Sequence, residues 1–151
     1  MATREELKKQ VLFEGLSDDM LDVIAAGCRE ITLKKGDSLF REKEDAKGVY
    51  LIRSGKVEIS KKTDDGWKQR LVIFSANHFF GELSIMERRE HEADATALED
   101  ARLFLMPKDF FNSLEKDNIQ IAHQIIKKIA VVMSNNLREM NSKFVKALIS
   151  Y

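Results

Sequence analysis

The residues with the clearest chemical potential lie in one stretch, Phe79 to Ala97, which reads FFGELSIMERREHEADATA. Gly81 has no side chain, so the backbone there can approach a ligand closely. Glu82 supplies a carboxylate that accepts hydrogen bonds, for example from sugar hydroxyls. The stretch therefore predicts a ligand-binding turn. Taken alone, the same pair is also compatible with a turn that carries a solvated glutamate.

Backbone amides are the second chemical resource of this stretch. A helical turn is expected from Ser84 to Arg88. The first N–H groups of a helix have no partner within it and attract negative charge. The amides of Leu83, Ser84 and Ile85 are therefore expected to form an anion site beside Glu82.

The elements that must position these groups are short strands between Cys28 and Pro107. Runs rich in Val, Ile, Phe and Tyr alternate there with turn residues. They predict strands at Glu30–Leu33, Ser38–Phe40, Val49–Arg53, Val57–Lys62, Gln69–Phe74, Ala95–Leu98 and Ala101–Met106. Asp65-Gly66 is a strong hairpin signal, and Ser54-Gly55 is expected to form a tight hairpin turn as well. Many short strands at close spacing favour a sandwich, barrel or jelly roll.

Helices are expected on both sides of the barrel. Ser17 is a good N-cap for a first helix that stops at Gly27. After Pro107 a short helix is expected over Lys108–Glu115. Asp117 or Asn118 then caps a much longer helix that runs to about Ala147. The chain is accordingly read as one domain, with N-terminal helices in 1–27, a barrel in 28–107 and C-terminal helices in 108–151.

The long helix carries two apolar faces. The first is a regular seam of nine residues: Ile119, Ala122, Ile126, Ala130, Met133, Leu137, Met140, Phe144 and Ala147. The second is a shorter stripe of Ile121, Ile125 and Val132. One helix with two apolar faces needs two surfaces to cover them, and the seam has the mean spacing of a coiled coil. The barrel and a second copy of the chain are the expected surfaces, which predicts a homodimer. The alternative is a bend near Ser134 to Asn136 that folds the tail back onto its own barrel.

Composition limits the classes of function. Hydrophobic residues make up 44% of the 151-residue chain, and 25 basic residues balance 25 acidic ones. The balance, and an end at Tyr151 directly after the long helix, argue against direct DNA binding. One cysteine, Cys28, excludes an internal disulfide and is read as a small buried hydrophobe. Three scattered histidines build no zinc or cupin metal site, and no catalytic triad is evident, so an enzyme is not expected.

No targeting or membrane segment is visible. The N-terminus, MATREELKKQVLF, is charged and has no apolar run before a cleavage site. No stretch approaches the roughly 18 uncharged apolar residues of a membrane span. A cytoplasmic protein with no membrane partner is the expectation.

Five short motifs carry a family resemblance when their order is considered. They are LFEGLS at Leu12–Ser17, KGDSLFRE at Lys35–Glu42, VYLIRSGKV at Val49–Val57, FGELS at Phe80–Ser84, and ALED at Ala97–Asp100 with Leu103–Met106. From Leu12 to about Met133 the sequence resembles the cyclic-nucleotide-binding domain family, of the catabolite activator and protein kinase A regulatory subunit type. The resemblance implies a double-stranded β-helix, or jelly-roll barrel, with N-terminal helices and a long C-terminal helix.

The resemblance also implies a binding site, with one departure. In the family, the residues that match Gly81, Glu82, Leu83 and Ser84 bind the ribose hydroxyl and the cyclic phosphate of cAMP or cGMP. An arginine, often after a proline, pairs with the phosphate, and these two positions hold Glu90 and His91 in this chain. Histidine is short and mostly neutral at pH 7, whereas arginine is a charged fork.

Charge in the surrounding segment adds to this departure. Between Gly81 and Asp94 five acidic residues face two arginines; the acidic residues are Glu82, Glu87, Glu90, Glu92 and Asp94, and the arginines are Arg88 and Arg89. Two features of the segment could compensate for the missing phosphate-binding arginine. Arg89 has the same strand parity as His91 and can turn toward the phosphate, or the carboxylates keep His91 protonated.

Two functions remain open at this stage. The first is a regulatory sensor that binds cAMP, cGMP or a related anion and signals through the long helix to an effector. The family resemblance also implies that this helix closes over the base, where Ser134 and Asn135 would contact a purine. The second is an interaction or dimerisation module that no longer binds a nucleotide. Neither requires a cofactor.

Overall fold

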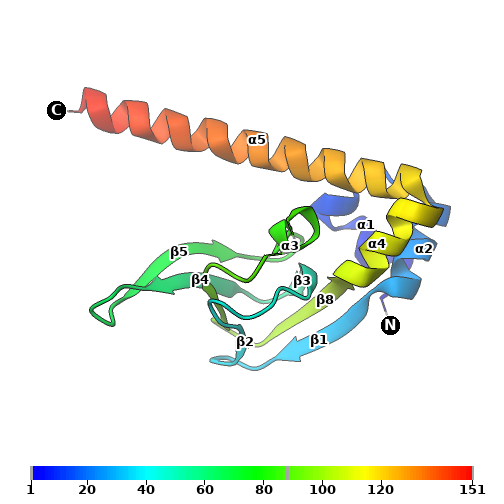
Figure 1. Ribbon diagram of the computed structural model, residues 1–151, viewed down its shortest axis with the longest axis horizontal. Coiled ribbons are helices and arrows are strands. Elements are labelled where there is room, and N and C mark those ends of the chain that lie inside the picture. The colour runs from blue at the N-terminus through cyan, green and yellow to red at the C-terminus, as the bar shows by residue number, and fades with distance from the viewer. Residues whose placement is uncertain (1, 88, 151) are drawn as a thin grey trace.

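Two antiparallel four-stranded sheets build the barrel in the computed structural model, which describes residues 2–87 and 89–150 (Figure 1). The sheet orders are β1-β8-β3-β6 and β2-β7-β4-β5. The strands are β1 (Arg29–Leu33), β2 (Ser38–Phe40), β3 (Gly48–Ser54), β4 (Val57–Lys62), β5 (Lys68–Phe74), β6 (Phe79–Phe80), β7 (Asp94–Ala97) and β8 (Ala101–Pro107). Alternate residues of these strands, such as Ile52, Val57 and Leu103, fill the interior. The expected jelly roll with helices at both ends of the chain is confirmed.

The seven predicted strands are all present, each within one residue of its expected ends. Sequence reasoning missed only β6 among the strands of the described residues. Its two residues are too short to show an alternating pattern, yet they pair with β3 through Tyr50↔Phe80 and Leu51↔Phe79. This short strand delivers the chain to the expected ligand-binding turn.

One turn was predicted correctly and another was not. Asp65-Gly66 closes a hairpin, because β4 and β5 pair along their length. Ser54-Gly55 does not, since β3 and β4 lie in different sheets. The chain crosses from one sheet to the other there, and Gly55 has a φ of 89°. A Cβ on Gly55 would lie 2.5 Å from the Asp100 carbonyl oxygen, so this crossing depends on glycine.

The N-terminal helices pack on the end of the barrel as α1 (Arg4–Lys8), the 3-10 turn η1 (Val11–Phe13) and α2 (Asp18–Gly27). The Ser17 hydroxyl caps α2 by accepting from the Met20 N–H at 3.3 Å, as predicted. A Cβ on Gly27 would lie 2.2 Å from the Phe110 ring, so the end of α2 also has a packing role. Burial raises the pKa of the Cys28 thiol to about 12, which fits a packing residue.

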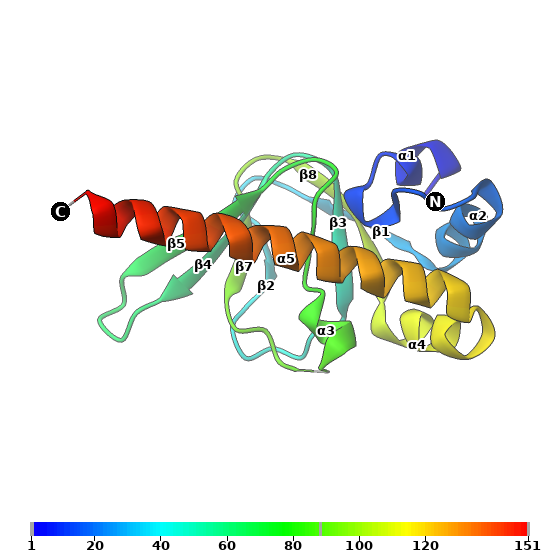
Figure 2. The ribbon, with the colours of Figure 1, turned by 90° about the horizontal axis from the view of Figure 1, so that it is seen from above.

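The C-terminal helices are α4 (Lys108–Asp117) and α5 (Ile119–Ile149). α5 crosses over the barrel as one unbroken helix and continues beyond its anchored region, the residues near its start that pack on the core (Figures 1 and 2). The alternative of a bend near Ser134 is therefore excluded. Asn118 occupies the N-cap position, but its side chain makes no cap hydrogen bond.

The two predicted faces of α5 have different fates. The buried residues of α5 are Ile121, Ala122, Ile125 and Ile129, and Ile126 and Val132 pack partly buried against the same core. Ile129 belongs to neither predicted stripe, and Ala122 is a seam residue. The seam is exposed beyond this region, with 58% of Leu137 and 65% of Phe144 accessible. The core, with α4 and η1 as the main neighbours of α5, thus covers only the first part of the helix.

The sheet crossing gives a stability prediction. We expect Gly55→Ala to lower the free energy of unfolding by about 2–5 kcal/mol, because it adds a backbone clash to the cost of a positive φ. Gly36→Ala is the matched control, since its φ is 91° and no atom lies within 4 Å of the position that its Cβ would take. It should lose only about 1–2 kcal/mol. Urea unfolding of both variants measures the difference, and equal losses would contradict this account of the crossing.

Candidate functional site

A cavity of about 250 Å³ opens beside the expected ligand-binding turn. It is lined by Phe40, Ala46, Ile59, Val72, Phe74, Phe80, Gly81, Glu82, Leu83, Ser84, Arg89, Glu90, His91, Glu92 and Ala93. We call it the barrel cavity. All six residues predicted for the site line it. Four of them follow β6 directly, at positions 81–84, and Arg89 and His91 lie nearer to β7. The fold therefore brings together what sequence spacing suggested.

The turn at Gly81 is shaped by close packing. Gly81 has a φ of 81°, and a Cβ there would lie 3.0 Å from the Gly48 carbonyl oxygen and 3.3 Å from the Tyr50 ring. Glycine lets the backbone pass β3 at this distance and turn into α3 (Leu83–Met86). The helical turn is thus shorter than the expected Ser84–Arg88, and Arg88 lies outside the described residues.

The expected cradle of three free amides is not formed. The Ser84 N–H donates to the Gly81 carbonyl oxygen at 3.1 Å, and the Ile85 N–H donates to the Glu82 carbonyl oxygen at 3.2 Å. The Ser84 hydroxyl also donates to the Gly81 oxygen, at 2.7 Å. Only the Leu83 N–H has no acceptor within residues 2–87 and 89–150. The donors of Ser84 and Ile85 are thus used by carbonyl oxygens of the same turn, which leaves few N–H groups to bind an anion.

Glu82 remains the acceptor of the site. It lies at the wall of the barrel cavity, and burial raises the pKa of its carboxyl group. A ligand that donates hydrogen bonds would replace the water that the carboxylate loses on burial. Its contact with ligand hydroxyl groups stays a prediction.

His91 forms a buried wall of the cavity. Its side chain is only 9% exposed, and its ring lies flat on Phe40 with the centroids 3.5 Å apart and 3° between the planes. The backbone is fixed on both sides, because the His91 N–H donates to the Glu44 oxygen and the Lys43 N–H donates to the His91 oxygen. The Nε2 atom is enclosed and has no hydrogen-bond partner among the described residues.

The expectation of a protonated His91 is wrong. Burial lowers the pKa of His91, and the opposing effect of the nearby Glu44 carboxylate is smaller. Charging the ring would cost its desolvation in an aromatic environment. The residue at the family's arginine position is therefore a buried, stacked imidazole whose surroundings disfavour the charged form.

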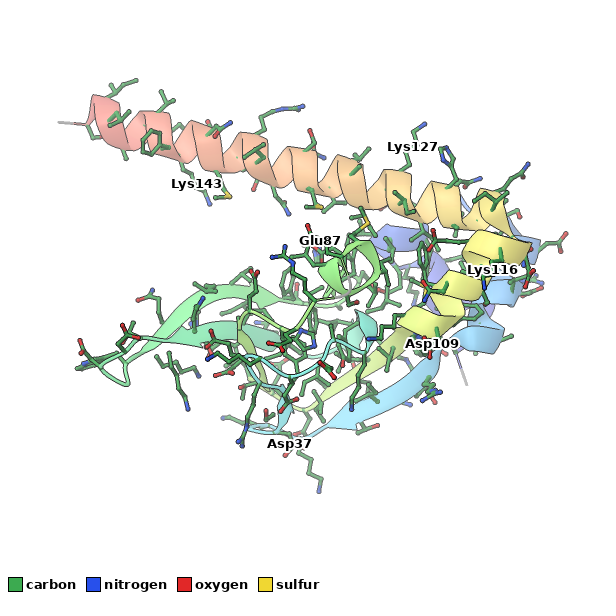
Figure 3. The ribbon with its side chains drawn as sticks, in the orientation of Figure 1. Asp37, Glu87, Asp109, Lys116, Lys127 and Lys143 are labelled. Carbon is green, nitrogen blue, oxygen red and sulfur yellow. The ribbon has the colours of Figure 1, made fainter. Side chains whose placement is uncertain are left out.

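Arg89 reaches the cavity but is already paired. Its guanidinium makes an ion pair with Glu87, and Nη1 lies 2.8 Å from a Glu92 carboxylate oxygen. Figure 3 shows Glu87 at the end of α3, on the side of the barrel that faces α5. The three side chains are about half exposed, so each pair is weak and exchangeable. The idea that Arg89 simply replaces the missing arginine is thus incomplete, because two carboxylates compete for it.

Aromatic residues form the part of the site that sequence reasoning did not identify. Phe80 stacks on Tyr50 at 5.4 Å and on Phe74 at 5.3 Å, measured between ring centroids. Phe40 extends this layer to His91. Two aliphatic residues add to this apolar wall: Ile59 and Val72 are paired across β4 and β5, and both line the cavity. The cavity therefore offers flat apolar walls to a planar ligand.

The expected contact of α5 with a bound base finds no support in the geometry. Within the described residues no part of α5 lines the barrel cavity, so Ser134 and Asn135 do not reach it. The same residues contain no group of three His, Cys, Asp or Glu side chains that could hold a metal ion. No described helix is long and apolar enough to cross a membrane.

Comparisons with known proteins agree with this geometry. Residues 30–118 match the family profile of the cyclic nucleotide-binding domain. The chain is 28% identical over 138 residues to the CRP-like cAMP-activated global transcriptional regulator of Mycobacterium tuberculosis, which covers 91% of this chain and 60% of that protein. It is 33% identical to the anaerobic regulatory protein of Bacillus subtilis, over 85% of this chain and 52% of that protein. The chain thus spans between half and two thirds of the length of these relatives.

A solved structure shows the same architecture. The chain is similar to the sensor domain of the transcriptional regulator DNR from Pseudomonas aeruginosa, with a TM-score of 0.73 and 26% identity. The match covers 90% of this chain and 91% of that one. The similarity extends over barrel and helices together.

The buried imidazole gives a prediction on pH. The folded-state pKa of His91 lies below its ordinary value of 6.5, so the unfolded chain binds the proton more readily. This contribution to stability is present above pH 6.5 and is lost as the pH falls through the folded-state pKa. We expect the free energy of unfolding to fall more steeply from about pH 7.5 to about pH 5.5 in the wild type than in His91→Gln. Urea unfolding across this range measures it, and parallel curves would contradict a neutral buried ring.

Proposed function

Because the chain belongs to the cyclic nucleotide-binding domain family, we propose that it is a regulatory ligand-sensing domain. A small molecule binds in the barrel cavity and alters how α5 engages its partner. The supporting observation is the convergence of all six predicted site residues on one cavity beside the packed turn at Gly81. Sensing needs no reacting group, and the proposal includes neither catalysis nor direct DNA contact by these residues.

Cyclic AMP and cyclic GMP are the first ligands to test. The Mycobacterium tuberculosis relative is by name cAMP-activated. Glu82, which lines the cavity, would accept from ribose hydroxyls, and a purine would pack on the aromatic layer. The weak point is the phosphate, which meets a neutral His91 in place of an arginine.

A second candidate is an interaction module without a nucleotide. It is favoured by the amides of Ser84 and Ile85, which are consumed within the turn, and by Arg89, which is engaged by two carboxylates. In this case the barrel supports α5 and the exposed seam makes the functional contact. Calorimetric titration with both cyclic nucleotides separates the two candidates.

Dimerisation through α5 is part of both candidates. In Figure 3 the side chains beyond the anchored region, Lys143 among them, extend with no barrel element around them. The exposed seam residues Met133, Leu137, Met140 and Phe144 are spaced alternately by four and three positions. A second α5 with the same spacing covers such a stripe in parallel register. An uncovered apolar stripe of this length is unusual on a monomer.

The phosphate position gives a prediction on affinity. We expect His91→Arg to strengthen cAMP binding at least about tenfold, because it restores a charge-assisted hydrogen bond worth about 1.5–3 kcal/mol. Arginine can also keep the stack on Phe40, since its guanidinium is planar. Calorimetry on the wild type, His91→Arg and the uncharged control His91→Gln measures the change. Unchanged affinity in His91→Arg would show that position 91 does not face the phosphate.

The seam gives a prediction on assembly. We expect the wild type to be a dimer by light scattering at tens of micromolar, a range in which a modest interface is occupied. Leu137→Glu with Met140→Glu should be monomeric, because four charges would be buried together in the dimer. Asn135→Glu with Ser142→Glu is the matched control, as it adds the same charge on the opposite side of the helix. A monomeric wild type, or a control that dissociates equally, would refute the seam as the interface.

A further inference from the structure

The barrel cavity carries an excess of negative charge. Among the described residues, three glutamates line it, the half-buried Glu82 and the exposed Glu90 and Glu92, against one arginine, Arg89. His91 adds no positive charge, because burial lowers its pKa. An anionic ligand would enter against this surplus and would lose water to meet a cation that is already paired.

Arg89, the arginine that lines the cavity, is paired with two glutamates close to it in the sequence. Arg89 makes ion pairs with both Glu87 and Glu92, so its Nε and Nη1 atoms already face carboxylates. A phosphate would have to displace at least one of them. Glu92 itself lines the cavity, which adds repulsion to competition.

The remaining features favour a different ligand chemistry. Phe74 and Phe80 present stacked aromatic faces, and His91 lies flat on Phe40 with an enclosed Nε2 atom that no group in the described chain satisfies. Glu82 is an acceptor for hydroxyl or N–H donors. These groups complement a flat ring with donors and do not complement a phosphate.

We propose that the barrel cavity selects a planar aromatic ligand that bears hydroxyl or N–H donors and no anionic group. Glu87 and Glu92 contribute to this selectivity by pairing with Arg89 and by adding negative charge beside the cavity. The inference rests on the proposed sensing function and specifies the chemical class of its ligand. A nucleoside has this chemistry, whereas a cyclic nucleotide adds the phosphate that the cavity disfavours.

Calorimetry with adenosine and cAMP on the whole chain tests the proposal. We expect the wild type to bind adenosine at least about tenfold more tightly than cAMP, the size of one missing charge-assisted contact. Glu87→Gln with Glu92→Gln should shift the ratio of the two affinities about tenfold toward cAMP, because it frees Arg89. Glu115→Gln with Glu139→Gln is the matched control, since both glutamates are exposed on α4 and α5 and do not line the cavity. It should leave the ratio unchanged.

The outcomes separate this inference from the proposed function. Wild-type binding of cAMP as tight as adenosine, or tighter, overturns the inference and leaves the sensor intact. If the wild type binds neither ligand and the double variant binds cAMP, the inferred preference for an uncharged ligand is overturned as well, while the cavity remains a ligand site. An unchanged ratio in the double variant overturns the role of Glu87 and Glu92. Absence of binding by either ligand to the wild type, the double variant and His91→Arg overturns both proposals.

Discussion

The face-to-face stack of His91 on Phe40 is the contact on which the barrel cavity depends. It ties the segment between α3 and β7 to β2, and two backbone hydrogen bonds to Lys43 and Glu44 hold the same residue. The stack fixes the position of the wall and also its charge, because a ring enclosed between aromatic neighbours is disfavoured as a cation. Shape and electrostatics of the cavity are thus two results of one contact.

The same backbone path can therefore serve different ligand chemistries. The turn at Gly81 is fixed by its approach to Gly48 and Tyr50, whatever the cavity binds. Charge is decided by side chains farther along, at Glu82, Arg89 and His91. Family membership, which rests largely on the barrel, accordingly says more about the fold than about the ligand. This separation explains how a family profile can match a chain that carries His91 at the family's arginine position.

Much of the fold was predictable, because local patterns determine it. Alternation located the strands, and Ser17 located the start of α2. The function of Ser54-Gly55 was not predictable, since a hairpin and a sheet crossing use the same turn residues. Burial of His91 was not predictable, because it depends on the stack with Phe40, which lies far away in the sequence. The assignment of α5 faces failed at Ile129 for a similar reason: both faces are apolar, and only the shape of the barrel decides between them.

The unbroken course of α5 has a mechanical consequence. The helix packs against the core up to Val132, and the rest, at about 1.5 Å per residue, forms an arm about 25 Å long. A rotation of about 5° at the held end would move the tip by about 2 Å, a displacement that follows from the length of the arm. That distance is comparable with the radius of a side chain, and packed interfaces tolerate much less. A small rotation of α5 near the barrel is thus amplified into a larger displacement at the C-terminal end of the helix.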